Sequence, residues 1–239
     1  MDIIYWSDYA CPYCYIGEVR LKKAIKLLNS DEDISLEMKS FQLDPTAGEH
    51  AASDTVTRFA KKYNLTKEQA AENIEHISRL GIGEGIDFKY ATTLFTNTMD
   101  AHRLTKLAQS KHEPDLTERV IERLFAAYFT DNSELADKSL LKKIGVECGL
   151  DENEIDEVLM SNKFRDEVED DEYSAAGYGI HSVPFFIING KYAISGAQST
   201  MEILASLRQV QNEEKIRAAA RAGGGMSCGP DGCRIEEHK

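Results

Sequence analysis

The chain has 239 residues, of which 42% are hydrophobic and 29% charged, and its formal net charge is −13. This size suits one soluble globular domain, or one domain with an insertion, that buries about 70% of its unfolded surface and needs no disulfides. The acidic charge argues against nucleic acid or an anionic membrane as the main partner. No apolar run approaches the roughly 18 residues of a membrane span.

The N-terminus and the cysteine content bear on where the protein works. The first ten residues contain no Lys or Arg and run directly into an apolar stretch, unlike a signal peptide. Five cysteines in a chain that is not exported predict reactive thiols rather than a disulfide framework. We therefore expect a cytoplasmic protein that meets a reducing thioredoxin or glutathione pool.

The motif Cys11-Pro12-Tyr13-Cys14 lies where a predicted strand over residues 3–6 turns into a predicted helix that runs to about residue 29. Cys11 falls next to the helix N-cap, where free backbone N–H groups and the helix dipole favour the thiolate, the reactive form of the sulfur. Cys14 falls on the apolar stripe of this helix. We therefore expect an exposed, nucleophilic Cys11 and a Cys14 packed against the core, which together indicate a redox dithiol.

The rest of the chain alternates between strand and helix patterns. Residues 34–39 predict a half-buried strand that completes a β-α-β unit with the first strand and helix. From about residue 48 to 178 only helical patterns follow, at 53–63, 66–81, 97–110, 114–129, 137–148, 152–160 and 163–177. Glycines at 81, 83 and 85 predict a loop. Strands at 183–188 and 191–195 flank Asn189-Gly190, a strong hairpin signal, and a last helix opens at Ser199.

This order predicts an α/β protein with a thioredoxin fold and a large inserted helical subdomain. Residues 1–47 and 179–222 are expected to form the thioredoxin-like domain, and residues 48–178 the insert. Residues 223–239 begin with three glycines and are expected to form a flexible C-terminal tail. The tail carries a second cysteine pair, Cys228 and Cys233, separated by turn residues.

Taken together, these stretches resemble the DsbA family of thiol–disulfide oxidoreductases, in particular its FrnE-type subgroup without a signal peptide. The resemblance covers residues 1 to about 210 and rests on the cysteine motif and on residues 7–8, 15, 17, 41–45, 97–98, 101–104, 124–125, 127–129 and 179–186. It implies that Pro184 is cis and lies beside the cysteines, and that Val183 offers backbone groups to a substrate strand. Pro12 and Tyr13 are expected to contact substrate as well. The family usually has Gly where this chain has Ser182, and the preceding His181 is a candidate for tuning the thiolate.

Three functions from different classes fit these residues. The first is dithiol exchange, in which Cys11 attacks a disulfide and Cys14 resolves the mixed disulfide. Its substrates would be disulfide- or thiol-containing proteins or small molecules, its redox partner the thioredoxin or glutathione system, and no cofactor or metal is required. The second is a glutathione-dependent isomerase or transferase of the same insertion fold, although such relatives typically have Ser in place of Cys11. The third is a Cys₄ zinc site built from both cysteine pairs.

We favour the first function and expect Cys228 and Cys233 to act as an internal relay pair for it. Two other residues are interpreted as structural. His102 lies on a helix that the family packs over the active site, and we expect its ring to be satisfied by hydrogen bonds. Cys148, at a helix end, is expected to be a small buried hydrophobe.

Overall fold

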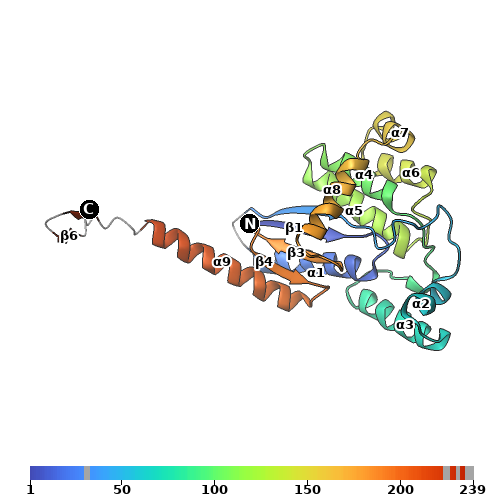
Figure 1. The fold of residues 1–239 in the computed structure, drawn as a ribbon, viewed down its shortest axis with the longest axis horizontal. Helices are drawn as coiled ribbons and strands as arrows, with labels where there is room; N and C mark the ends of the chain where they lie inside the picture. The colour runs from blue at the N-terminus through green and yellow to red at the C-terminus, as the bar shows by residue number, and fades with distance from the viewer. Residues whose placement is uncertain (30–32, 223–226, 230–231, 235–239) are drawn as a thin grey trace.

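The computed structural model describes residues 1–29, 33–222, 227–229 and 232–234, with side chains up to residue 220 (Figure 1). A central sheet has the strand order β2-β1-β3-β4. Its strands are β1 (Asp2–Ser7), β2 (Ser35–Ser40), β3 (Phe185–Ile188) and β4 (Tyr192–Ser195). β1 pairs parallel with β2 and antiparallel with β3, and β3 pairs antiparallel with β4. None of the helices in the described residues is long and apolar enough to cross a membrane.

Helices connect and cover this sheet. α1 (Pro12–Leu28) follows β1, and α9 (Thr200–Ala222) follows β4. Between β2 and β3 the regular elements are α2 (Thr55–Tyr63), α3 (Lys67–Gly83), the 3-10 helix η1 (Tyr90–Thr92), α4 (Met99–Gln109), α5 (Pro114–Phe129), α6 (Lys138–Cys148), α7 (Glu152–Met160) and α8 (Arg165–Gly177). The thioredoxin fold with a helical insertion is thereby confirmed.

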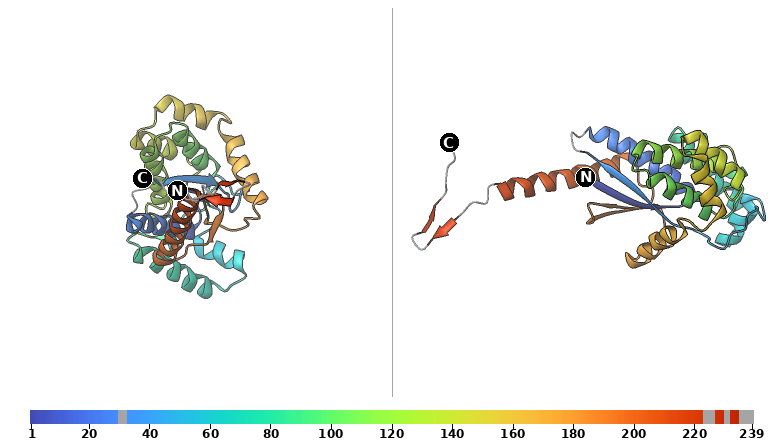
Figure 2. Two further views of the ribbon diagram at one scale, coloured as in Figure 1. Left: turned by 90° about the vertical axis from the view of Figure 1, so that its left-hand side faces the viewer. Right: turned by 90° about the horizontal axis from the view of Figure 1, so that it is seen from above.

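The helices form two layers around the sheet (Figure 2). α1 and α9 pack against each other on one face, where the main apolar core joins Tyr5 and Phe186 of the sheet to Leu21 of α1 and Leu207 of α9. α8 lies against the other face, over a smaller cluster around Trp6. The sheet therefore separates the environment of α1, which carries the cysteine motif, from that of α8.

Local sequence signals explain most helix boundaries. A capping box between Thr66 and Gln69 starts α3, as expected from the sequence. The predicted loop from Gly81 is wrong, because α3 continues to Gly83. A Cβ atom on Gly81 would lie 2.5 Å from Cγ of Phe88, so this glycine lets the Phe88 ring pack directly on the helix. The glycine signals close packing here rather than a turn.

α9 is packed in its first half and is exposed over residues 215–220. Ile203, Leu204, Leu207 and Val210 are buried, whereas no side chain in residues 211–220 is buried. Figure 1 shows this second half running beyond the sheet toward the hairpin formed by β5 (Ser227–Gly229) and β6 (Gly232–Arg234). Cys228 and Cys233 are paired opposite each other in the hairpin, but their side chains lie outside the described part of the chain. The expectation of a flexible tail falls largely on residues outside that part too.

Candidate active site

The cysteine motif sits at the junction of β1 and α1, as the sequence predicts. Cys11 is the N-cap of α1 with extended backbone dihedrals, φ −94° and ψ 114°, and Pro12 begins the helix. The Cys11 backbone N–H donates to the Asp8 carbonyl at 3.0 Å, which forms a tight turn before the helix. The Cys11 thiol points to the loop before β3 and donates to the Val183 carbonyl, with 3.5 Å between Sγ and O.

Both sulfurs of the motif are buried, and the expectation of an exposed Cys11 is wrong. Cys11 is 4% exposed and Cys14 is 1% exposed. Cys11 still lines a cavity, so a reagent reaches it through that opening, whereas Cys14 packs in the main core. Burial raises the pKa of the Cys14 thiol well above its usual range, and the adjacent Cys11 adds to the rise. Cys14 is therefore a neutral thiol, packed in the core behind Cys11.

The loop that faces Cys11 is held tightly against α1. The Val183–Pro184 peptide bond is cis, as the resemblance implied. The Gly196 N–H donates to the Pro184 carbonyl at 2.9 Å. A Cβ atom on Gly17, one turn after Cys14, would lie 2.9 Å from Cγ of Pro184. The absence of a side chain at Gly17 thus allows the Pro184 ring to lie directly on the helix that carries both cysteines.

A cavity of about 480 Å³ opens over Cys11. Of the residues that the sequence singled out around the motif, Cys11, Pro12, Tyr13, His181, Ser182 and Val183 line it, whereas Cys14 and Pro184 do not. The remaining lining residues are Ala10, Leu43, Arg58, Phe59, Lys62, Tyr63, Leu65, Asn73, Ile77 and Tyr90. Most of these come from α2, α3 and η1 in the helical insert. Sequence reasoning missed them because the pattern of a helix does not tell which part of the sheet it covers.

A buried polar cluster lies beside the motif. The Asp8 carboxylate is 1% exposed and accepts the backbone N–H groups of Ala10 at 3.2 Å and Leu43 at 2.8 Å. It thereby fastens the turn before Cys11 to the segment after β2. His102 on α4 is fully buried, with Nε2 3.5 Å from Oδ1 of Asp8. Neither ring nitrogen of His102 has a hydrogen-bond partner in the described residues, so the expectation of a hydrogen-bonded ring is wrong. The Asp8 oxygens are instead used by backbone amides.

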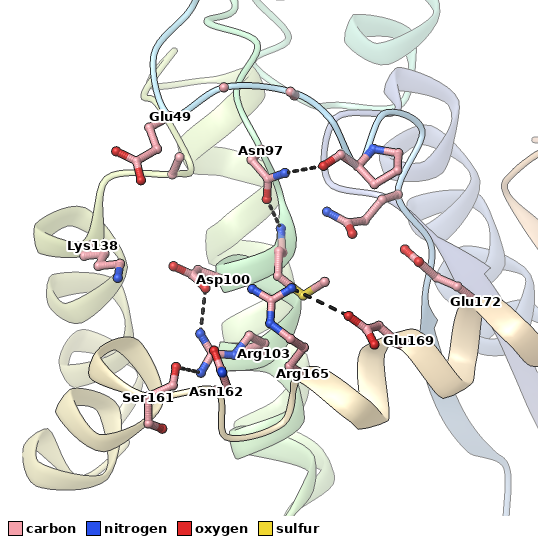
Figure 3. Close-up of a pocket in the computed structure, with 16 residues that line it drawn as sticks. Glu49, Asn97, Asp100, Arg103, Lys138, Ser161, Asn162, Arg165, Glu169 and Glu172 are labelled. Atoms are coloured by element: carbon pink, nitrogen blue, oxygen red, sulfur yellow. Dashed lines mark hydrogen bonds and ion pairs between the residues drawn. The ribbon is translucent and has the colours of Figure 1, made fainter.

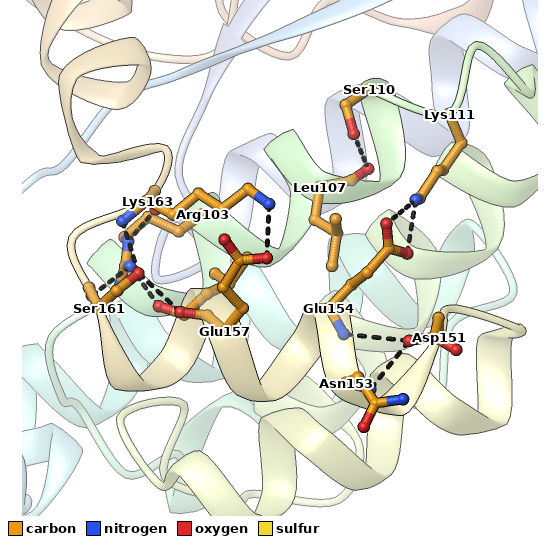
Figure 4. A network of polar contacts seen from close by, with 11 residues as sticks. Arg103, Leu107, Ser110, Lys111, Asp151, Asn153, Glu154, Glu157, Ser161 and Lys163 are labelled. Atoms are coloured by element: carbon orange, nitrogen blue, oxygen red, sulfur yellow. Dashed lines mark hydrogen bonds and ion pairs between the residues drawn. The ribbon is translucent and has the colours of Figure 1, made fainter.

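The neighbouring Arg103 holds α4 in place. Its buried guanidinium donates to the backbone carbonyls of Val158, Ser161 and Lys163 and to the Asp100 carboxylate. Figure 4 shows Arg103 beside Ser161 and Lys163. These bonds tie α4 to α7 and to the segment before α8. Arg103 therefore supports the helix that places His102 beside Asp8, and it takes no part in the cavity over Cys11.

A second cavity, of about 700 Å³, lies away from the cysteines (Figure 3). Its lining is polar and includes the carboxylates Glu49, Asp100, Glu169 and Glu172. Arg103 and Arg165 at its edge are each paired with a carboxylate, as Figure 3 shows. Among the residues whose side chains the structure describes, none that the sequence singled out as a site residue lines this cavity.

The structure does not bring the two cysteine pairs together. The β5–β6 hairpin that carries Cys228 and Cys233 lies beyond the C-terminal end of α9, away from Cys11 (Figures 1 and 2). Within the described residues there is no group of three or more His, Cys, Asp or Glu side chains that could hold a metal ion. Cys148 is buried, as expected, and its thiol donates to the Arg119 carbonyl at 3.6 Å.

Several solved structures share this fold. Streptomyces coelicolor SCO1869, described as a probable DsbA oxidoreductase, is 29% identical with a TM-score of 0.83, over 99% of this chain and 100% of that one. A 2-hydroxychromene-2-carboxylate isomerase is 13% identical with a TM-score of 0.66, over 92% and 98% of the two chains. The cytosolic disulfide reductase DsbM of Pseudomonas aeruginosa, solved with GSH, is 14% identical with a TM-score of 0.61, over 89% and 100%. The last two show likeness of fold alone.

A family-wide comparison covers most of the chain. The sequence model of the DSBA-like thioredoxin domain matches residues 2–208, from β1 into the packed half of α9. This span includes the cysteine motif, the helical insert and the loop that contains Pro184. The chain therefore belongs to the DSBA-like thioredoxin domain family, whose fold is that of thiol oxidoreductases and related isomerases.

Proposed function

We propose that this protein is a thiol–disulfide oxidoreductase in which Cys11 is the attacking sulfur and Cys14 the resolving sulfur. The observation that carries the proposal is the contrast between the two thiols. Cys11 lines an open cavity at the N-terminus of α1, whereas Cys14 is sealed in the core with a raised pKa. Exchange requires a sulfur that the substrate disulfide can reach, and of these two sulfurs only that of Cys11 lies at an opening.

The chemistry proceeds in two balanced steps. The Cys11 thiolate attacks one sulfur of a substrate disulfide, the substrate S–S bond breaks, and the first substrate thiolate leaves. The Cys14 sulfur then attacks Sγ of Cys11, the bond between Cys11 and the substrate breaks, and the proton of Cys14 passes to the departing substrate sulfur, which leaves as a thiol. A Cys11–Cys14 disulfide remains. The substrate gains two electrons and the protein loses two. The reverse sequence oxidises a dithiol substrate.

The surroundings of Cys11 support this assignment. The Val183 carbonyl accepts the Cys11 thiol and thus marks where a substrate chain would meet the sulfur. Tyr13, which is 41% exposed, and the exposed His181 stand at the mouth of the cavity. Burial raises the pKa of Tyr13, with Cys11 adding to the rise, so its hydroxyl stays protonated as a donor. Pro12, Tyr13, Val183 and His181 are accordingly proposed as substrate-binding residues.

The redox partner and the compartment complete the proposal. The Pro-Tyr dipeptide matches that of glutaredoxins, whose potentials are around −200 to −230 mV. We propose a mid-range couple that works in the cytoplasm with the glutathione or thioredoxin system, as a member of the FrnE-type subgroup. The two alternatives are less well supported. The sulfur at position 11 differs from the Ser typical of the isomerases. The hairpin that carries Cys228 and Cys233 lies beyond α9, away from the start of α1 that carries the other two cysteines of the zinc hypothesis.

We also propose that Cys228 and Cys233 exchange electrons with the Cys11–Cys14 pair. The geometry of α9 sets a condition for this relay. The helix is roughly 33 Å long, and a fully extended chain from Ala222 to Cys228 spans only about 20 Å. α9 starts close to Pro184, because the Gly196 N–H contacts the Pro184 carbonyl. Exchange within one chain therefore requires the second half of α9 to bend or unwind.

Two experiments test these proposals. The potential of the Cys11–Cys14 couple, measured in glutathione buffers, should fall in the mid-range, and Cys11→Ser should abolish exchange with any disulfide. A protein with Cys11→Ser that still reduces disulfides would refute the assignment. Deleting residues 226–239 should slow re-oxidation of the Cys11–Cys14 pair, and unchanged rates would remove the relay but leave the exchange activity of Cys11 intact.

A further inference from the structure

The cavity over Cys11 carries positive charge in an acidic protein. The chain has 41 Asp and Glu against 28 Lys and Arg, yet the residues that line this cavity include Arg58 and Lys62 and no carboxylate. The second, larger cavity has a mixed lining, in which four carboxylates lie among the cations Arg103, Lys138 and Arg165. The positive charge of the cavity over Cys11 therefore differs from the acidic average of the chain.

Arg58 is a cation without an anionic partner. It lies half-buried on α2, with its guanidinium carbon 3.8 Å from the centre of the Phe95 ring. Its Nε atom is buried and has no hydrogen-bond partner in the described residues. Nor does any carboxylate in that part of the chain lie within ion-pair distance of Arg58. Burial of a charged group without a partner is costly, and proteins normally pair such groups.

Lys62 extends this charge along the cavity. It lies four residues after Arg58 on α2, and side chains with that spacing share one face of a helix. Its ammonium group lies 5.7 Å from the centre of the Tyr63 ring and forms no ion pair within the described residues. The two cations therefore face the same cavity, and both are available to a ligand.

The cations lie near the reacting sulfur. Burial raises the pKa of Tyr90 well above its usual range; Arg58 opposes this rise, whereas Cys11 adds to it. The Tyr90 side chain is thus close enough to Arg58 and to Cys11 for the charge of each to affect its pKa. Tyr90, Arg58 and Cys11 all line the same cavity. A ligand bridging them would place an anionic group on Arg58 and a sulfur atom on Cys11.

We propose that the cavity selects small disulfides and thiols that bear carboxylates, and that Arg58 and Lys62 bind the carboxylate while Cys11 exchanges with the sulfur. This inference rests on the proposed exchange function and names its substrate class. A planar guanidinium binds a carboxylate through two parallel hydrogen bonds, which fixes orientation as well as charge. The cavity of about 480 Å³ has the size of a small-molecule site rather than of a groove for a folded protein.

The test compares disulfides of different charge in single-turnover exchange with the reduced full-length protein. Glutathione disulfide supplies carboxylates, bis(2-hydroxyethyl) disulfide is neutral, and cystamine is cationic. Arg58→Gln should slow exchange with glutathione disulfide by about 10- to 100-fold, the loss of a charge-assisted hydrogen bond. Exchange with the neutral disulfide should change by less than about twofold, which corresponds to ~0.4 kcal/mol, because this disulfide has no carboxylate for Arg58 to bind. Lys62→Gln should act in the same direction with a smaller effect.

Lys61→Gln is the matched control, because Lys61 is exposed on the same helix and does not line the cavity. It should leave both rates unchanged. If Arg58→Gln slows both disulfides equally, Arg58 acts on the structure of the site and the inference is overturned. It is also overturned if Arg58→Gln leaves exchange with glutathione disulfide unchanged.

A binding measurement separates this inference from the proposed function. S-methylglutathione has the carboxylates but no exchangeable sulfur, so calorimetric binding reads the cavity without any redox step. Wild type should bind it, and Arg58→Gln should weaken the affinity by at least about tenfold, which corresponds to one charge-assisted contact. Arg58-dependent binding without any disulfide exchange would refute the exchange function but keep the carboxylate site. Exchange without Arg58-dependent binding would support the exchange function but refute the carboxylate site.

Discussion

Gly17→Ala should impair exchange at Cys11 far more than it impairs folding. The added Cβ would lie 2.9 Å from Cγ of Pro184, 3.4 Å from Cζ of Phe186 and 3.5 Å from Cβ of Ala197. Carbon atoms pack best at about 3.5–4.0 Å, so the Pro184 ring must move by roughly 0.6–1 Å. Overpacking of this kind costs about 1–3 kcal/mol. Replacing glycine inside a helix returns about 1 kcal/mol, so the net loss in unfolding free energy should be about 0–2 kcal/mol.

The effect on rate should be larger because Pro184 follows Val183, whose carbonyl contacts the Cys11 thiol at 3.5 Å. A displacement of about 1 Å at a reacting centre can slow a reaction by roughly 10²-fold. We expect the second-order rate of exchange with bis(2-hydroxyethyl) disulfide to fall by about 10- to 100-fold in the folded protein. Urea unfolding gives the stability of the same samples.

Two other glycines provide controls for Gly17→Ala. A Cβ on Gly145 would lie 2.7 Å from Cδ1 of Ile155, in a helix pair away from Cys11, so Gly145→Ala should lower stability without slowing exchange. A Cβ on Gly83 would meet nothing within 4 Å, so Gly83→Ala should affect neither quantity adversely. Equal losses of rate in Gly17→Ala and Gly145→Ala, or an unchanged rate in Gly17→Ala, would refute the proposed role of the contact between Gly17 and Pro184.

Three further predictions concern the surroundings of the cysteines. Burial raises the pKa of Cys14 in the folded state, so the neutral Cys14 thiol contributes its full stabilisation below the unfolded-state pKa of about 8.5, and this contribution is lost as pH rises toward the folded-state pKa. The reduced wild type should therefore lose stability between pH 8 and 10 more steeply than Cys14→Ser. Equal slopes of stability against pH for the two proteins, measured by urea unfolding, would contradict this prediction. Lys22 pairs with Glu18 at 2.8 Å, and with Glu118 and Glu122 at 2.9 Å, while the Glu18 side chain is only 4% exposed. Lys22→Gln should therefore lower the unfolding free energy by about 2–3 kcal/mol, because it leaves the buried Glu18 carboxylate without its partner. The double variant with Lys22→Gln and Glu18→Gln should recover much of that loss. A Lys22→Gln protein as stable as wild type would show that the pair contributes only as a surface contact. Asp8→Asn replaces one of the two acceptor oxygens of Asp8 by an amide donor that faces a backbone N–H, so it should lower the unfolding free energy by about 1–3 kcal/mol and slow exchange. Asp44→Asn is the control, because it affects only an exposed turn at Thr46 and should leave both the unfolding free energy and the exchange rate nearly unchanged.

The sequence alone determined the elements that depend on near neighbours in the chain. The cysteine motif at a strand-to-helix junction, the capping box of α3 and the hairpin at Asn189-Gly190 are all local signals, and the structure contains each of them. The order of these elements identified the thioredoxin fold and its helical insertion. The resemblance to a known family added the cis bond before Pro184. The choice of Cys11 and Cys14 as a redox pair also came from the sequence.

Only the tertiary structure decided what surrounds these cysteines, because the helical insert returns to the sheet at a point that no local pattern specifies. It buries Cys11 beneath the region of α2, α3 and η1, where the sequence led us to expect an exposed sulfur. It places Arg58 of the insert in the same cavity as a sulfur that is 47 residues away in the chain, and it leaves the Arg58 Nε atom without a partner among the described residues. It also turns Gly81 from an expected loop residue into a packing site for Phe88. Contacts between distant segments depend on which helix faces which part of the sheet, and periodicity within a single helix carries no information about that pairing.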